Sequence, residues 1–224
     1  MAREPIEMLI ETVTTELPDT KTIRLQWPDG HAPDFLTGQF ITLYWPDTPG
    51  YKRAYSLSSC ALDRGSYEVT VKREGKMGTR VVDWAKPGDK LFVLPPAGKF
   101  LPVFEPQKHL ICIAGGSGVT PFRGFVREAT RRELETKITV LYSVRTTNDI
   151  IFQREFLDYA AQTPTSPFWS PVPAFTRKMC GPAIVGASRP SGCGNRFTTC
   201  PTRFSMRVVR TRWWNLPRNW CCTA

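Results

Sequence analysis

The first hundred residues alternate between apolar and polar positions in short segments that turn residues separate. This alternation predicts β-strands at residues 6–17, 21–27, 39–45, 53–59, 67–74 and 90–94. Residues 75–84 begin as a glycine-rich turn and are expected to be helical from residue 79. Six short strands with turn signals between them predict a small antiparallel barrel.

The pattern changes near residue 109. A continuous apolar run at 110–114 is typical of a buried parallel strand. A glycine-rich turn follows it, and apolar residues then recur at helical spacing over 122–134. A second buried strand is expected at 137–144 and a second helix at 152–161. This order predicts an α/β domain with a parallel sheet. We therefore divide the chain into a barrel domain (1–103), the start of an α/β domain (104–162) and an atypical tail (163–224).

Charge is distributed unevenly along the 224 residues. The net charge is +10, but residues 159–224 hold nine of the 30 Lys and Arg residues and none of the 20 Asp and Glu residues. This tail is rich in Pro, Trp and Cys and lacks the periodicity of a helix or strand. One interpretation is a basic arm whose tryptophans stack on nucleic-acid bases. Nothing in residues 1–158 supports that interpretation, so no nucleic-acid partner is expected.

Four residues in one predicted strand carry candidate binding chemistry, namely Arg53-Ala54-Tyr55-Ser56. They combine a fixed cation that can fork onto a phosphate, an aromatic plane and a hydroxyl group. This set suits a ligand with a pyrophosphate and a flat heteroaromatic ring. An ordinary half-buried strand can carry the same residues, so the run alone does not distinguish a binding site from a structural strand.

The turn Gly115-Gly116-Ser117-Gly118 lies between a buried strand and a helix. Glycines let the backbone approach a phosphate, and the helix N-terminus offers unpaired N–H donors. The turn lacks the G-x-G-x-x-G spacing of the dinucleotide fingerprint, so a plain strand-to-helix turn is the alternative.

Several motifs in order over residues 6–160 resemble the ferredoxin–NADP reductase superfamily. The run at Arg53 resembles its R-x-Y-S flavin motif, and the run from Gly116 to Pro121 resembles its G-x-G-x-T-P nicotinamide motif. Residues 75–79 resemble its flavin pyrophosphate loop, and residues 96–100 its P-x-G-x-F turn. Residues 142–145, followed by Asp149, match the run after its second α/β strand.

The resemblance implies a fold: a six-stranded antiparallel Greek-key barrel that binds FAD, followed by a parallel-sheet α/β nicotinamide domain that is incomplete here. It also implies roles for single residues. Arg53 would pair with the FAD pyrophosphate, and Tyr55 would lie against the isoalloxazine ring. Ser56 would form a hydrogen bond near flavin N5. The remaining residues implied in cofactor binding are Ala54, Met77, Gly78, Thr79, Gly115, Gly116, Ser117, Gly118, Thr120, Pro121, Ser143 and Arg145.

The resemblance further implies an NAD(P)H-dependent reductase that passes electrons through FAD to a ferredoxin or an oxygenase component. Tyr55, Ser56 and Thr120 would lie at the reacting rings, and the protein would need no metal of its own. One alternative is an NAD(P)H-flavin or quinone reductase with a small acceptor. Another is a flavin-binding remnant without turnover. We expect a cytoplasmic protein without a membrane span, because no apolar run is long enough for a membrane helix. We also expect a monomer.

Other polar residues are expected to have ordinary roles. We interpret His31 as a solvated loop residue, His109 as an edge residue of its strand and Cys112 as a small core residue. The basic run 127–132 is interpreted as a solvated helix face that could also contact an acidic electron-transfer partner.

The tail is interpreted as a frameshifted form of the family's C-terminus. Cys180-Gly181-Pro182 lacks a buried strand before it and is taken as a chance match to the family's Cys-Gly-Pro. Permitted codons for residues 204–215, read one frame later, spell an apolar strand end, Cys-Gly-Pro and a helix start.

Overall fold

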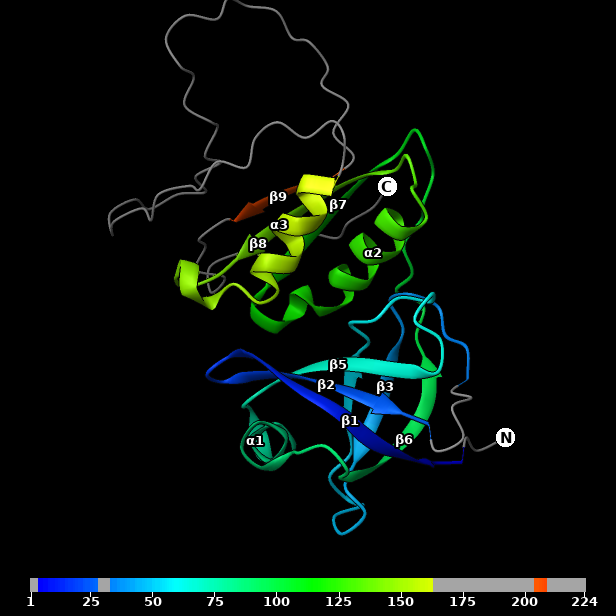
Figure 1. The fold of residues 1–224 in the computed structure, drawn as a ribbon, viewed down its shortest axis with the longest axis vertical. Helices are drawn as coiled ribbons and strands as arrows, with labels where there is room; N and C mark the ends of the chain where they lie inside the picture. The colour runs from blue at the N-terminus through cyan, green and yellow to red at the C-terminus, as the bar shows by residue number, and fades with distance from the viewer. Residues whose placement is uncertain (1–3, 28–32, 163–203, 209–224) are drawn as a thin grey trace, which may run out of the picture.

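A computed structural model describes residues 4–27, 33–162 and 204–208. It contains a six-stranded antiparallel sheet and, after it in the chain, a three-stranded parallel sheet with two long helices (Figure 1). The predicted fold class is therefore confirmed. His31 and Cys180-Gly181-Pro182 lie outside the described residues, as does all of the tail except 204–208.

The barrel consists of strands β1 (Ile6–Leu17), β2 (Thr20–Gln26), β3 (Phe40–Tyr44), β4 (Arg53–Ser56), β5 (Ser66–Lys72) and β6 (Lys90–Ala97). They pair in the order β4-β3-β6-β1-β2-β5, and every pair is antiparallel. A bridge between Leu57 and Val69 joins the two outer strands. Through it the sheet closes on itself, and neither outer strand is left unpaired along its whole length.

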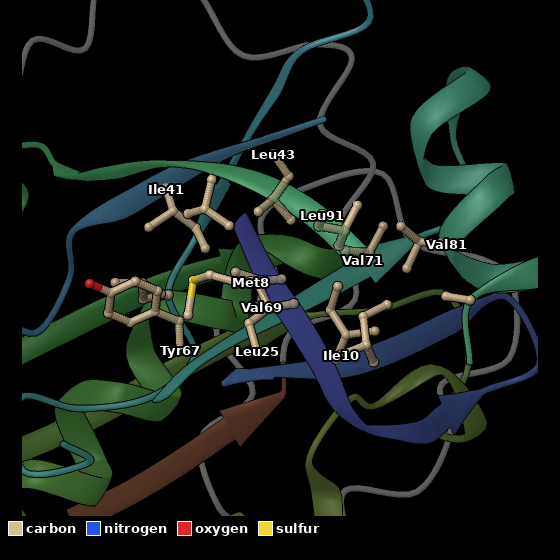
Figure 2. Packing of buried hydrophobic residues seen from close by; sticks show 14 of the residues in the cluster. Met8, Ile10, Leu25, Ile41, Leu43, Tyr67, Val69, Val71, Val81 and Leu91 are labelled. Atoms are coloured by element: carbon tan, nitrogen blue, oxygen red, sulfur yellow. The ribbon is translucent and has the colours of Figure 1, made fainter. Parts of the chain in front are cut away.

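Alternate residues of these strands point into one apolar core (Figure 2). In β5, Val69 and Val71 are fully buried, and Thr70 between them is buried as well. In β2, Ile23 and Leu25 are fully buried, whereas Arg24 between them is exposed. Period-two burial is what the alternating sequence predicted. Tyr67 is also buried, and its hydroxyl donates a 2.7 Å hydrogen bond to the Pro33 carbonyl.

Helix α1 (Gly75–Trp84) connects β5 to β6 and packs on the barrel. It is helical from Gly75, four residues earlier than the sequence predicted. Met77 and Val81 bury one face of the helix in the barrel core. That burial outweighs the low helix propensity of Gly75 and Gly78.

The α/β part begins with β7 (His109–Gly115), a short 3-10 turn η1 (Gly116–Val119) and α2 (Thr120–Arg131). It continues with β8 (Lys137–Ser143), a second short turn η2 (Thr147–Asp149) and α3 (Gln153–Gln162). Strand β9 (Phe204–Val208) lies parallel to β8. The sheet order is β7-β8-β9.

Helices α2 and α3 cover one face of this sheet (Figure 1). Cys112 of β7 is 2% exposed in the core that they form with the sheet. The expectation that Cys112 is a small core residue is confirmed. Burial raises the pKa of its thiol to about 12. His109 lies at the start of β7, where its ring Nε2 is 2.7 Å from the Thr139 hydroxyl. Among the described residues, no helix has the length and apolar character needed to span a membrane.

Helix α2 also packs on the barrel, and this corrects the interpretation of residues 127–132. The side chain of Arg127 is only 18% exposed, and it pairs with Asp63 and Glu68 of the barrel domain. Arg131 pairs with Asp63 as well. The basic face of α2 is therefore in large part a contact between the two domains. The sequence showed that these basic residues share one face of a helix. It did not show their carboxylate partners, which lie about 60 residues away in the sequence.

Candidate functional site between the two domains

Strand β4 presents its polar residues at an outer strand of the barrel sheet. The Arg53 guanidinium is exposed and donates a 3.0 Å hydrogen bond to the Lys52 carbonyl. Tyr55 is half-buried and packs against the barrel core. Burial raises the pKa of its phenol, although the charge of Arg53 acts in the opposite direction. At neutral pH, β4 thus offers an exposed cation and a neutral phenol two residues apart, with the half-buried Ser56 next to it.

The N-terminus of α1 is the second component. Its N-cap residue, Glu74, makes no side-chain capping bond, and the first turn contains no acidic residue. The first backbone N–H groups of a helix have no partners within the helix, so they are suited to an anion. Gly75 and Thr79 line an open hollow of about 750 Å³ beside this turn, with Lys76, Arg80 and Trp84.

A row of contacts ties α1 to the loop that leads into β4. Lys76 donates a 2.7 Å hydrogen bond to the Tyr51 hydroxyl. One turn later, Arg80 pairs with Asp47 at 2.7 Å and lies 4.3 Å from the centroid of the Trp45 ring. Because Tyr51 is two residues before Arg53, these contacts hold the start of α1 and the start of β4 on the same side of the barrel.

These groups fit the pyrophosphate of a dinucleotide. The fold supplies uncapped helix N–H groups, the exposed Thr79 hydroxyl and the Arg53 guanidinium, and phosphate oxygens accept from all three. The Met77 side chain lies in the barrel core, which leaves only its backbone for contact with a ligand. A β-carbon at Gly78 would lie 2.3 Å from the Lys72 carbonyl oxygen, so α1 needs glycine there to pack on β5.

The glycine turn η1 lies at the end of β7, held by two side-chain hydrogen bonds. The Tyr142 hydroxyl donates to the Gly116 carbonyl at 2.8 Å, and the Thr120 hydroxyl donates to the Ser117 carbonyl at 2.6 Å. Burial raises the pKa of Tyr142 to about 12, which keeps this donor protonated. Since Thr120 is 4% exposed and its hydroxyl is engaged within the turn, the geometry favours a positioning role for it.

The remaining residues predicted at the nicotinamide cluster at the carboxyl ends of two parallel strands. Gly115 of β7 pairs in register with Ser143 of β8. Arg145 follows two residues later and is exposed. In open α/β sheets, ligands bind at this end of the strands. Gly118 is exposed, and a β-carbon there would meet no atom within 4 Å. The turn therefore has room for a ligand, and Pro121 follows it, buried in the first turn of α2.

Both predicted sites meet at β5. Strand β4 and the turn η1 each contact this strand. The Ser58 N–H, two residues after Ser56, donates a 2.8 Å hydrogen bond to the Glu68 carbonyl. The Ser58 hydroxyl is buried and, within the described ranges, has no hydrogen-bond partner. The fold thus brings the Arg53 strand and the glycine turn to a shared strand, although they are about 60 residues apart in sequence.

Sequence reasoning missed the residues that hold the two sites together. Arg123 is 8% exposed and bonds Glu68 of β5 and Glu155 of α3, each at 2.6 Å. Gly124 lies against the barrel, where a β-carbon would be 2.7 Å from the Ser59 carbonyl oxygen. Glu128 accepts a hydrogen bond from Thr37. The available signal was the spacing of Arg123, Arg127 and Arg131, which places them on one face of a helix.

Two domain models match the chain in the expected order. Residues 7–101 match the oxidoreductase FAD-binding domain. Residues 112–178 match the oxidoreductase NAD-binding domain. The prediction of FAD and a nicotinamide as cofactors is confirmed at the level of the domain families.

Curated relatives of the chain include ferredoxin reductases. The chain is 32% identical over 168 residues to the ferredoxin reductase component of 3-ketosteroid-9-alpha-monooxygenase from Mycolicibacterium smegmatis, covering 71% of this chain and 47% of that one. It is 30% identical over 154 residues to ferredoxin–NADP reductase B from Sorangium cellulosum, covering 68% and 63%. The chain spans about half the length of the first of these relatives.

Solved structures share the arrangement of both domains. The flavohem-like FAD/NAD-binding domain of nitric oxide dioxygenase from Vibrio cholerae superposes with a TM-score of 0.65 at 25% identity, covering 71% of each chain. Phthalate dioxygenase reductase superposes with a TM-score of 0.59 at 27% identity, covering 68% of this chain and 47% of that one.

Proposed function

Because this chain belongs to the ferredoxin–NADP reductase superfamily, we propose that it is an NAD(P)H-dependent flavoprotein reductase that delivers electrons to a ferredoxin or an oxygenase component. One observation carries the proposal: β4 and the glycine turn η1 both contact β5. Two cofactor sites that share one strand can bring their ligands' reacting rings together. Bound FAD supplies the chemistry, since it can accept a hydride and release electrons one at a time.

In this proposal, the chain's own residues bind FAD and orient it. Arg53, the first turn of α1 and the Thr79 hydroxyl hold the pyrophosphate of FAD in this proposal, and Tyr55 lies against its ring system. Ser56 donates a hydrogen bond at the reacting edge of that ring. Support comes from the exposed guanidinium, the uncapped helix start and the neutral, half-buried phenol.

On the nicotinamide side, backbone groups from Gly115 to Gly118 approach the dinucleotide. Thr120 and Tyr142 support this role by fixing the carbonyls of Ser117 and Gly116. Ser143 and Arg145 are assigned to the adenosine end, because they lie at the carboxyl end of β8. A monomeric state and a cytoplasmic location belong to the same proposal.

Anaerobic reduction of the purified, FAD-loaded protein tests the proposal. NADH and NADPH should each be mixed with it while flavin absorbance is followed, and the faster one is the physiological donor. A ferredoxin and a free quinone should then be compared as electron acceptors. Faster turnover with the quinone would favour a small-acceptor reductase, and FAD binding without reduction by either nicotinamide would leave only a flavin-binding protein.

A further inference from the structure

The barrel and the α/β domain are joined by a compact group of buried ion pairs. Glu68 of β5 accepts from Arg123 at 2.6 Å and from Arg127 at 3.1 Å. Glu155 of α3 pairs with the same two arginines, at 2.6 Å and 3.4 Å. Glu68 and Arg123 are 14% and 9% exposed, and little water reaches the bond between them.

Glu68 is also fixed to the strand that follows the flavin motif. Its backbone carbonyl accepts from the Ser58 N–H at 2.8 Å, and its own N–H donates to the Ser59 hydroxyl at 3.2 Å. Ser58 is two residues beyond Ser56. A displacement of the Glu68 carboxylate therefore acts on a backbone segment next to the flavin motif.

Arg123 is similarly close to the glycine turn. It lies three residues after Thr120, whose hydroxyl closes that turn, so the two residues are one helical turn apart. The neighbouring Gly124 lets the helix backbone approach the Ser59 carbonyl oxygen. Arg123 is held from its other side by Glu155 and by the Phe152 ring, 4.6 Å from its guanidinium carbon.

We propose that the Glu68–Arg123 pair is a positioning device that sets the separation between the flavin motif at Ser56 and the nicotinamide turn at Thr120. This inference rests on the proposed function, because it assigns those two segments to the two cofactors. Misplacement of reacting groups by about 1 Å can lower a rate on the order of a hundredfold. A buried ion pair suits this task, because the forked guanidinium of Arg123 bonds two carboxylates at once, Glu68 through Nη1 and Glu155 through Nε, and its geometry is fixed more narrowly than that of an apolar contact.

The variants that test the proposal are Arg123→Gln and Glu68→Gln. The matched control is Lys108→Gln, since Lys108 forms an exposed ion pair with Glu105 within the α/β domain and contacts neither Glu68 nor Arg123. The first measurement is flavin reduction at saturating nicotinamide in the full chain loaded with FAD. Arg123→Gln should lower this rate on the order of tenfold or more, while the dissociation constant for FAD changes less than twofold. Lys108→Gln should match the parent.

A second measurement does not depend on activity. Hydrogen exchange should rise in Arg123→Gln at residues 56–59 and at 116–124 together, although the first segment belongs to the other domain. Arg123→Lys, which keeps a cation but loses the fork, should fall between Arg123→Gln and the parent in both measurements. If Arg123→Gln does not fold, Glu68→Gln and Arg123→Lys still provide the same two measurements.

The outcomes separate this proposal from the proposed function. Parent-like reduction and exchange in Arg123→Gln and Glu68→Gln would overturn the positioning role, and so would increased exchange confined to α2. A parent protein that nicotinamide does not reduce would instead refute the proposed function. In that case the joint rise in exchange at the two segments still decides whether the pair couples them.

Discussion

The Arg123 guanidinium of α2 donates a 2.6 Å hydrogen bond to the Glu68 carboxylate of β5, and both side chains are nearly excluded from solvent. This hydrogen bond is one of several that join α2 to the barrel. On the barrel side, the Glu68 backbone bonds Ser58, two residues beyond Ser56, and on the other side Arg123 lies three residues after Thr120, whose hydroxyl bonds the glycine turn. The residues that pack the two domains together therefore lie next to the two proposed cofactor sites.

Replacing Arg53 should weaken FAD binding. In Arg53→Ala the affinity should fall by on the order of 1.5–3 kcal/mol, because a charge-assisted phosphate contact is lost. Since Arg53 is exposed and outside the core, the free energy of unfolding of the apoprotein should hardly change. Flavin fluorescence titration measures the affinity. Arg24→Ala, which removes another exposed arginine of the barrel, is the control and should bind FAD as the parent does.

A side chain at Gly118 should block the nicotinamide without disturbing the fold. A β-carbon there meets no atom within 4 Å, so Gly118→Val should retain stability and FAD affinity. Flavin reduction by NAD(P)H should fall steeply, because the backbone can no longer approach a phosphate closely. Stopped-flow absorbance measures the rate. Reduction at the parent rate would mean that the turn serves only the fold.

Two glycines of α1 should respond differently to alanine. At Gly78 the new β-carbon would lie 2.3 Å from the Lys72 carbonyl, so the helix must shift, at a cost of about 1–3 kcal/mol of stability. FAD affinity should fall as well, because the first turn moves with the helix. Gly75 has φ +62° and open space around it, so Gly75→Ala should lose about 1–2 kcal/mol from backbone strain alone. Urea unfolding and FAD titration of both variants check this contrast; equal FAD affinities would contradict it.

Acid should weaken the contact between the domains through Asp63. Burial would raise the pKa of this carboxyl, but the Cys60 N–H, Arg127 and Arg131 together lower it below its ordinary value. A carboxyl with a lowered pKa in the folded state stabilises the fold above its unfolded pKa of about 3.9, and this contribution is lost as pH falls through the folded value. Urea unfolding at pH 7 should show the parent more stable than Asp63→Asn. Below about pH 4 the difference should shrink; a difference independent of pH would contradict this role.

The fold was largely predictable, because the barrel strands alternate clearly and β7 and β8 are continuous apolar runs. The start of α1 was not, since Gly75 and Gly78 resemble turn residues until Met77 and Val81 are seen in the barrel core. Local pattern also could not show which face of α2 meets another domain. The arginine partners lie at residues 63, 68 and 155, and only the tertiary fold brings them together.

The fold places the predicted binding residues in two groups, and their contacts within the protein differ. Thr120 and Tyr142 shape the glycine turn through their hydroxyls, and Met77 fills the core. A motif marks positions that a family keeps together, and it does not distinguish a residue that touches a ligand from one that shapes the backbone. That distinction requires burial and hydrogen-bond partners, which depend on residues far away in the sequence.

Because α2 is buried on two sides, the order in which the chain is synthesised should affect its folding. Residues from Thr120 to Val126 are all buried between the sheet and the barrel, so this half of the helix requires both surfaces. The barrel strands are translated first, and their surface can fold before α2 leaves the ribosome. A circular permutant that begins at His109 would reverse this order. Its α2 would be synthesised before the barrel, so its apolar and arginine side chains would stay uncovered until the barrel had been made. A larger share of the newly made chains should therefore aggregate.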